Sequence, residues 1–151
     1  MKLRRAQPDD ARMLFDWRND PLTRAASHRQ DVVSYDDHLT WMAAVLADPA
    51  RSLFVAEADG RPVGTVRVEQ DEDGSILLSW TVAPEARGQG AGKAMVAMAV
   101  AQLGTWRTVR AQVRAWNLAS VRVAEAAGLR LSGRDGDILH FRRDPREGED
   151  E

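Results

Sequence analysis

The feature of this sequence that most constrains its fold is the glycine-rich stretch from Arg87 to Lys93, RGQGAGK. The apolar run at 75–82 before it predicts a β-strand, and the small-residue run at 91–103 after it predicts a largely buried helix. Because glycine has no Cβ, backbone N–H groups in such a loop can approach a bulky anion closely. The first turn of the following helix adds unpaired N–H donors and the positive end of the helix dipole. The stretch therefore predicts a strand–loop–helix unit that cradles a pyrophosphate group.

Two well-known phosphate-binding loops do not match this stretch. A Walker A loop needs a glycine five residues before its Gly-Lys pair and a Ser or Thr after that pair, where this chain has Arg87 and Ala94. A dinucleotide-binding loop needs a third glycine at the position of Lys93. A glycine-rich turn without any ligand is the alternative interpretation. We disfavour it because strand, loop and helix follow one another in the order that an anion site requires.

Length and composition limit the classes of protein to consider. A chain of 151 residues, 44% hydrophobic and 29% charged, has the size and composition of one globular domain. It contains no cysteine, which excludes disulfides, thiolate metal sites and cysteine nucleophiles, and we expect no metal site. A net charge of −2 does not favour nucleic-acid or membrane binding, and no apolar run reaches membrane-spanning length. Residues 1–6 lack the apolar core of a signal peptide, so we expect a cytoplasmic protein.

The N-terminal third predicts a strand at 3–6 and then two helices. Pro8 and the two acidic residues after it suit the first turn of a helix, and the run 19–21, Asn-Asp-Pro, ends that helix. Residues 22–33 show no hydrophobic period and predict a loop. A second helix is expected from the N-cap Ser34 to a residue near 48. Its apolar face is predicted to consist of Leu39, Met42, Ala43 and Leu46.

The rest of the chain predicts alternating strands and helices. The expected elements are strands 52–58, 61–69 and 75–82, helix 91–103, strand 109–114, helix 119–127, and strands 131–132 and 138–142. Turns at 59–60 and 71–74 join the first three strands, Gly128 ends the last helix, and a turn at 133–137 closes the final hairpin. The acidic segment 144–151 is expected to be a disordered tail, so the predicted domain spans 1–143.

A second motif follows the strand at 109–114. Asn117 stands directly before a helix that also carries Ser120 in its first turn and ends in Gly128-Leu129. Asn and Ser both accept hydrogen bonds from the first N–H groups of a helix. Helix capping is therefore one interpretation of Asn117 and Ser120.

Both motifs resemble those of the Gcn5-related N-acetyltransferases, the GNAT family. The stretch from Arg87 to Gly92 fits the family's acyl-CoA loop pattern, Gln/Arg-x-x-Gly-x-Gly/Ala, and Asn117 stands where the family has an Asn beside the pantetheine arm. The element order over residues 3–142 is also similar. The resemblance implies a single α/β (α+β) domain with a mixed, mostly antiparallel sheet of six or seven strands and about four helices. It implies acetyl-CoA as cofactor, bound by Val82, Ala83, Arg87, Gly88, Gln89, Gly90, Ala91, Gly92, Lys93 and Asn117.

The resemblance also implies how the chemistry proceeds. The end of the strand at 75–82 would pair with the pantetheine arm as an added strand would. A backbone N–H near Val82 or Ala83 would polarise the thioester carbonyl. An amine would then attack the thioester directly, because the chain offers no cysteine nucleophile.

This chain departs from the family at two catalytic positions. The usual tyrosine acid is replaced by Ala124, and a frequent glutamate base is replaced by Leu77. Loss of a general acid slows a reaction by about 10²–10⁴-fold without preventing it, and a thiol is a good leaving group. Ser120 or a water is a candidate acid. Glu69, Ser79 and His38 are the candidate bases.

Two further stretches concern the acceptor. Trp17, Arg18 and Asn19 end the first predicted helix, and His38 and Trp41 lie in the second. These residues are similar to patterns in acetyltransferases that modify amino groups on nucleotide-linked deoxysugars, so that class is the leading acceptor. Tryptophans that pack in the core are the alternative interpretation of Trp17 and Trp41.

Other functions remain open at this point. A protein N-terminus, as on ribosomal proteins, and a small-molecule amine are the alternative acceptors. A non-catalytic acyl-CoA-binding sensor is the alternative of another class. By analogy with the family, we expect a possible homodimer.

Overall fold

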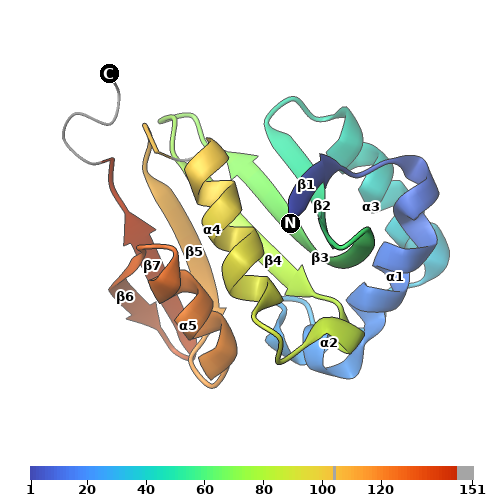
Figure 1. The fold of residues 1–151 in the computed structure, drawn as a ribbon. Helices are drawn as coiled ribbons and strands as arrows, with labels where there is room; N and C mark the ends of the chain where they lie inside the picture. Colours follow the sequence, from blue (N-terminus) through green and yellow to red (C-terminus); the bar gives the residue numbers. More distant parts are fainter. Residues whose placement is uncertain (104, 146–151) are drawn as a thin grey trace.

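The computed structural model describes residues 1–103 and 105–145. Its strands, in chain order, are β1 (Lys2–Arg5), β2 (Arg51–Ala58), β3 (Arg61–Gln70), β4 (Ile76–Val82), β5 (Val109–Arg114), β6 (Arg130–Asp135) and β7 (Ile138–Arg143). They form one seven-stranded sheet in the order β1-β2-β3-β4-β5-β7-β6 (Figure 1). All neighbouring strands are antiparallel except β4 and β5, which are parallel. The predicted mixed, mostly antiparallel sheet is confirmed.

Helices lie on both faces of this sheet. They are α1 (Ala11–Asn19), α2 (Pro21–Ala26), α3 (Tyr35–Ala47), α4 (Ala91–Leu103) and α5 (Leu118–Ala126), with short 3₁₀ turns at Pro8–Asp10 and Pro84–Ala86. One buried cluster joins α4 and α5 to the sheet around Ile76, Leu78 and Met95. A second cluster joins α1 and α3 to β2 around Val45 and Val55. Figure 1 shows α4 lying in front of β4 and β5.

The parallel pair of β4 and β5 is short. Its register begins at Ile76 and Val109 and ends at Leu78 and Ala111. Beyond Leu78, β4 pairs only with β3, as far as Val82. Figure 1 shows β4 and β5 running apart on either side of α4. The second half of β4 therefore has an open edge toward β5, which we call the β4–β5 gap.

The hydrogen-bond ladder between β3 and β4 decides which backbone groups face this gap. The N–H of Ala83 donates to the carbonyl of Val63 at 2.8 Å. In an antiparallel pair, successive residues direct their N–H and C=O groups alternately toward the partner strand and away from it. Because Ala83 directs its N–H toward β3, Val82 and Trp80, one and three residues earlier, direct their backbone N–H and C=O groups away from β3. These two residues therefore present backbone N–H and C=O groups to the β4–β5 gap.

The predicted loop at 22–33 is partly wrong, because residues 21–26 form α2. The reason lies in the residues that were expected only to end α1. Asp20 is the N-cap of α2 and accepts the N–H of Thr23 at 3.1 Å, and Pro21 occupies the first helical position. Asp-Pro is a favourable start for a helix as well as a stop for the one before it. The turn that ends α1 thus begins α2.

Two other details differ from expectation. The buried face of α3 consists of His38, Met42 and Val45, whereas Leu39 and Leu46 are exposed. The face is rotated by about one residue because the aromatic packing of α1 draws His38 inward. The last hairpin is tighter than predicted, since β6 continues to Asp135 and leaves a much shorter turn before β7. The predicted cap of α3 is confirmed, with Ser34 Oγ accepting from Asp37 N–H at 3.1 Å.

The C-terminal end is described as far as residue 145. Asp144, which was assigned to the tail, bonds to Thr108 Oγ1 at 3.1 Å and to Arg142 Nε at 2.9 Å. These contacts lower the pKa of Asp144, the bond to Arg142 most of all. The predicted disorder of 146–151 falls outside the described residues. Within the described ranges, none of the helices has the length and apolar character needed to cross a bilayer.

Candidate functional site

The glycine-rich stretch forms an open loop between β4 and α4. Gly88 and Gly90 have φ angles of +76° and +81°, in the left-handed region that favours glycine. A Cβ on either residue would meet nothing within 4 Å, so this side of the loop is unobstructed. The N–H groups of residues 88–93 have no hydrogen-bond acceptor within the described part of the chain. The loop and the first turn of α4 thus offer six consecutive donors, as an anion site requires.

Gly92 has a different part in the same unit. A Cβ there would lie 3.0 Å from Val123 Cγ2 and 3.2 Å from Val82 Cγ2. The missing side chain lets the start of α4 approach the end of β4 and the middle of α5. The packing requirement at Gly92 therefore fixes the position of the six donors relative to the β4–β5 gap.

Arg87 connects the loop to the acceptor-side helices. Its guanidinium bonds to the carboxylate of Asp20 and, at 3.1 Å, to the hydroxyl of Thr23. This hydrogen bond from Arg87 holds the pKa of Asp20 below its usual value. Lys93, by contrast, is exposed and forms no ion pair with the described residues. Arg87 thus lies beside the loop, with its positive charge paired with the carboxylate of Asp20.

Asn117 and Ser120 lie at the start of α5, where Asn117 is the N-cap. Asn117 Oδ1 accepts the N–H of Ser120 at 3.2 Å, so the predicted capping is present. Ser120 Oγ accepts the indole N–H of Trp80 at 3.3 Å. Since Trp80 also presents its backbone to the gap, this bond joins α5 to the open edge of β4. The amide nitrogen of Asn117 has no hydrogen-bond partner among the residues that the structure describes.

Glu69 and Ser79, two of the candidate bases, lie on the α3 side of the sheet with Arg67. Arg67 Nε lies 2.9 Å from Glu69 Oε1, and Arg67 Nη2 lies 3.5 Å from Ser79 Oγ. The Arg67 guanidinium also stands 5.7 Å from the ring centre of Trp41. Arg67 therefore gathers two candidate bases and one candidate acceptor-binding aromatic residue at one place, beside the gap.

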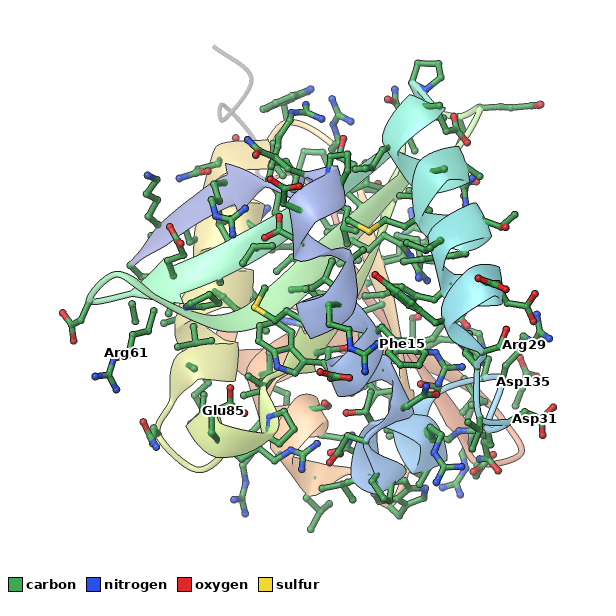
Figure 2. All side chains as sticks on the ribbon, turned by 90° about the vertical axis from the view of Figure 1, so that its right-hand side faces the viewer. Phe15, Arg29, Asp31, Arg61, Glu85 and Asp135 are labelled. Atoms are coloured by element: carbon green, nitrogen blue, oxygen red, sulfur yellow. The ribbon has the colours of Figure 1, made fainter. Side chains whose placement is uncertain are left out.

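His38, the third candidate base, is a core residue. It is 3% exposed and packs between Phe15 and Trp41, with ring centres 5.7 Å and 5.5 Å away. Figure 2 shows Phe15 between α1 and α3, where these rings meet. Burial, and then the charge of Arg18, lower the pKa of His38. His38 is therefore neutral and is enclosed by aromatic rings.

The predicted acceptor residues of α1 serve different purposes. Trp17 is 6% exposed and belongs to the core between α1, α3 and β2. Asn19 uses both ends of its amide on Val33, at 2.7 and 2.8 Å, and so ties down the segment before α3. Arg18 donates to the carbonyl of Arg29 at 2.7 Å, and its Nη1 is buried without a partner among the described residues.

The surroundings of Arg18 are cationic. Its pKa is lowered first by burial and then by the charges of Arg29, Arg24 and Arg67. Neither Arg18 nor Arg24 nor Arg29 has a carboxylate partner within the described ranges. A ligand that approaches this place meets a local excess of positive charge.

The sequence interpretation missed an open hollow of about 440 Å³ over β5, β6, β7 and the start of β4. Its lining includes Leu77, Gln112 and His140. His140 Nε2 lies 2.9 Å from Asp135 Oδ2. No sequence signal marks this pair, because only the register of the last hairpin brings the two side chains together.

The amino-acid sequence matches the acetyltransferase (GNAT) domain family over residues 1–130. No curated protein sequence shows a significant match. Among solved structures, spermidine N-acetyltransferase from Vibrio cholerae, in complex with CoA and spermine, is similar with a TM-score of 0.84 at 19% identity, over 95% of this chain and 94% of that one. Ribosomal-protein-alanine N-acetyltransferase from Brucella melitensis is similar with a TM-score of 0.78 at 23% identity, over 95% and 99%.

A third similar structure is an aminoglycoside acetyltransferase in complex with coenzyme A and kanamycin, with a TM-score of 0.80 at 20% identity over 95% of this chain and 94% of that one. These likenesses support the fold, and the family match covers most of the 151 residues. The six donors at the start of α4 and the open edge of β4 lie within the matched range. This chain therefore belongs to the GNAT family of acetyl-CoA-dependent acetyltransferases.

Proposed function

We propose that this chain transfers the acetyl group of acetyl-CoA to a primary amine at the β4–β5 gap. The observation that carries the proposal is the position of six N–H groups, without an acceptor in the described ranges, at the end of a strand with an open edge. Consecutive donors at a helix start suit a pyrophosphate group. An open strand edge suits the amides of a pantetheine arm, which would pair as an added strand does. Both requirements of acetyl-CoA are met side by side.

Each part of the site has a proposed role. The N–H groups of residues 88–93 hold the pyrophosphate, and Lys93 and Arg87 add positive charge. The N–H of Val82 or Trp80 donates to the thioester carbonyl and stabilises the negative charge that develops there. Ala83 is not available for this, because its N–H is bonded to Val63. Acetyl-CoA itself supplies an activated acyl group with a good leaving thiol.

The acceptor is a primary amine on a small molecule or at a protein N-terminus. The solved neighbours are named for spermidine, for aminoglycosides and for ribosomal-protein alanine. These names support the broader acceptor class better than our first expectation, a nucleotide-linked amino sugar. The homodimer and the cytoplasmic location stay predictions, since neither the fold nor these names bear on them.

One observation keeps an anionic acceptor as a second candidate. Arg18 lies among Arg24, Arg29 and Arg67, and its Nη1 is buried without a partner in the described chain. A polycation such as spermine is repelled by such a cluster, whereas a phosphate or carboxylate is attracted to it. An amine that also carries a phosphate, as a nucleotide-linked amino sugar does, fits this charge. Arg18→Met is expected to raise the KM for such an acceptor about tenfold or more, a loss of one charge-assisted bond.

The test of the proposed function compares two glycines of equal backbone strain. Gly90 and Gly60 have φ angles of +81° and +77°, and neither has an atom within 4 Å of an added Cβ. Gly90→Ala and Gly60→Ala are each expected to lose about 1–2 kcal/mol of stability. Only Gly90→Ala is expected to weaken CoA binding, by about tenfold or more, as measured by calorimetry. Equal CoA affinity in the two variants would contradict the proposed loop.

A turnover assay distinguishes an acetyltransferase from a non-catalytic protein that only binds acyl-CoA. Acetyl-CoA is offered with a panel that contains spermine, kanamycin, an alanine-ending peptide and a nucleotide-linked amino sugar, and thiol release is followed. We expect at least one amine to accelerate thiol release. Tight CoA binding with no acceleration by any amine would instead favour a non-catalytic acyl-CoA sensor.

A further inference from the structure

The helix α2 bridges the open end of the β4–β5 gap. At its N-terminal end, Asp20 is paired with Arg87, which lies just beyond the turn that follows β4. At its C-terminal end, the carbonyl oxygen of Ser27 accepts a hydrogen bond at 2.9 Å from Nη2 of Arg114, the last residue of β5. β4 and β5 are not paired with each other at these ends. The segment from Asp20 to Ser27 therefore crosses from one strand to the other where the gap is open.

The length of α2 suits this crossing. Its six residues rise about 1.5 Å each, so the helix is about 9 Å long. A pantetheine arm that pairs as an added strand between β4 and β5 needs two strand spacings of about 4.8 Å, or about 10 Å. The helix is therefore about as long as the gap must be wide to admit the arm.

Arg114 lies at the level of the thioester rather than at the closed end of the seam. The parallel register ends at Leu78 and Ala111, and three further residues along both strands place Arg114 level with Thr81. Thr81 stands between Trp80 and Val82, the two residues whose backbone N–H groups face the gap. One of these N–H groups is proposed to bind the thioester carbonyl. The attachment of α2 to β5 is therefore level with the proposed site of acetyl transfer, across the gap from it.

Arg114 projects from the face of the sheet away from α4. The buried cluster that joins α4 and α5 to the sheet includes Val109, Ala111 and Val113. Since successive side chains of a strand alternate between faces, Arg114 points to the side of α1 and α3. Figure 1 shows α2 on that side, behind the end of β4, and α4 in front of the gap. An acceptor amine therefore reaches the gap from the side of α1 and α3, past α2.

The guanidinium of Arg114 is itself held in place. Its Nη1 lies 2.9 and 3.1 Å from the two carboxylate oxygens of Asp137, in the turn between β6 and β7. The side chain of Arg114 is 14% exposed. A hydrogen bond from a charged donor is about twice as strong as one between neutral groups. The bond to Ser27 therefore comes from a rigid and strong donor.

Polar attachments of this kind determine where α2 lies, because the core does not. None of the residues 21–34 is buried. Besides the two bonds at its ends, the segment after α2 is held by Arg18 of α1, which donates to the carbonyl of Arg29 at 2.7 Å. Loss of the bond from Arg114 would leave α2 attached on the side of β4 and α1 only.

We propose that Arg114 is a positioning residue for the acceptor. It holds α2 across the open end of the gap and so keeps one side of the acceptor's entrance in place. This inference rests on the proposed function. Arg114 takes no part in the bond changes and touches none of the six donors at the start of α4. The bond from Arg114 therefore matters for the amine and not for CoA.

The experiment compares Arg114→Met with the matched control Arg110→Met. Arg110 lies on the same strand and face and is also paired with an aspartate of a turn, Asp71, but it is level with Leu77 at the closed end of the seam. The acceptor is the most active amine of the thiol-release panel. Arg114→Met is expected to raise the KM for this amine about tenfold or more, as a misplaced binding surface does, with the KM for acetyl-CoA unchanged. Arg110→Met is expected to change neither.

Two further variants test the bond itself. Arg114→Lys keeps a charged donor for the carbonyl of Ser27 and is expected to restore part of the lost affinity for the amine. Asp137→Asn leaves Arg114 in place but loosens its guanidinium, and it is expected to raise the KM for the amine less than Arg114→Met does. Calorimetry is expected to give wild-type CoA affinity for all of these variants.

Hydrogen–deuterium exchange tests the position of α2 without turnover. The backbone amides of residues 22–27 are expected to exchange severalfold faster in Arg114→Met than in wild type, because the helix loses one of its attachments. Exchange in Arg110→Met is expected to equal that of wild type in this segment.

The outcomes separate this inference from the proposed function. A wild-type chain that acetylates an amine, together with an Arg114→Met variant of normal KM for that amine, overturns the role of Arg114 alone. Equal rises in the KM for the amine in Arg114→Met and Arg110→Met also overturn it, as does unchanged exchange of residues 22–27. A wild-type chain that neither binds CoA nor releases thiol overturns the proposed function, and this inference with it.

Discussion

Asp20 and Arg87 are 67 residues apart in the sequence and joined by their side chains. The same Asp20 oxygen accepts the N–H of Thr23 at the start of α2. One carboxylate therefore caps a helix on the acceptor side and holds a guanidinium beside the loop that we expect to bind CoA. The two halves of the site share this residue.

Two substitutions of Asp20 are expected to separate its effect on CoA binding from its effect on stability. Asp20→Asn keeps a capping oxygen and removes the charge that neutralises Arg87, so we expect tighter CoA binding by severalfold. Asp20→Ala removes the cap as well, and we expect it to lose about 0.5–2 kcal/mol of stability. Calorimetry with CoA and urea denaturation measure the two effects. Unchanged CoA affinity in Asp20→Asn would mean that Arg87 adds no useful charge to the loop.

The bond from Trp80 to Ser120 predicts non-additive behaviour. Ser120→Ala and Trp80→Phe each remove one partner of the 3.3 Å bond, and each is expected to cost about 1 kcal/mol. The double variant is expected to cost less than the sum, as urea denaturation measures it. If Ser120 only anchors Trp80, the two single variants lose similar kcat. A far larger loss of kcat in Ser120→Ala would assign it the role of general acid.

His38 predicts a pH dependence of stability. Its pKa is lowered from 6.5 by burial, so the unfolded chain binds more protons than the folded chain just below pH 6.5. Stability therefore falls as the pH drops through this window. We expect His38→Leu to show a smaller loss of Tm between pH 7 and pH 5, with His28→Gln as the control. Equal slopes in wild type and His38→Leu would refute the burial argument.

The ion pair of Asp10 with Arg4 affects stability in a lower pH window and does not confound this measurement. The pKa of Asp10 is lowered below 3.8, first by its bond to Arg4. The stability that this pair contributes is present above pH 3.8 and is lost only as the pH falls further.

Gly64 on β3 predicts strong sensitivity to a single methyl group. A Cβ there would lie 2.5 Å from the carbonyl oxygen of Thr81 and 2.7 Å from Met95 Sδ. Thermal unfolding of Gly64→Ala is expected to show a loss of about 1–3 kcal/mol, as overpacked sites do. Gly133→Ala, on the exposed strand β6, would meet nothing within 4 Å and is the matched control. A Gly64→Ala variant as stable as Gly133→Ala would contradict the close packing of β3 on α4.

Most of the fold could be predicted from local signals in the sequence. Turn residues such as Asp59-Gly60 mark the hairpins, and the glycine-rich loop marks the junction of β4 and α4. The helix α2 was missed because Asp20-Pro21 is both a stop and a start signal. The buried face of α3 was missed because a polar residue, His38, is held inside by rings from another helix.

The candidate site also has one part that the sequence predicts and another that it does not. The anion loop is continuous in sequence, so its glycines could be recognised. The engagement of Asn19 by Val33, and of Arg87 by Asp20, depends on contacts between distant segments. The pair of His140 and Asp135 depends on the register of a hairpin whose turn was placed too early. Such contacts leave no local pattern for a sequence interpretation to detect.

The brevity of the parallel seam between β4 and β5 has a mechanical consequence. The two halves of the sheet are hydrogen-bonded to each other over only three residue pairs, so β4 and β5 can separate beyond those pairs. The width of that opening is then set by the helices that bridge it, at the contact of Gly92 with Val123. A larger side chain at this contact would push α4 and α5 apart and widen the separation of β4 and β5. Side chains that never touch a ligand therefore determine how much space the acyl donor has.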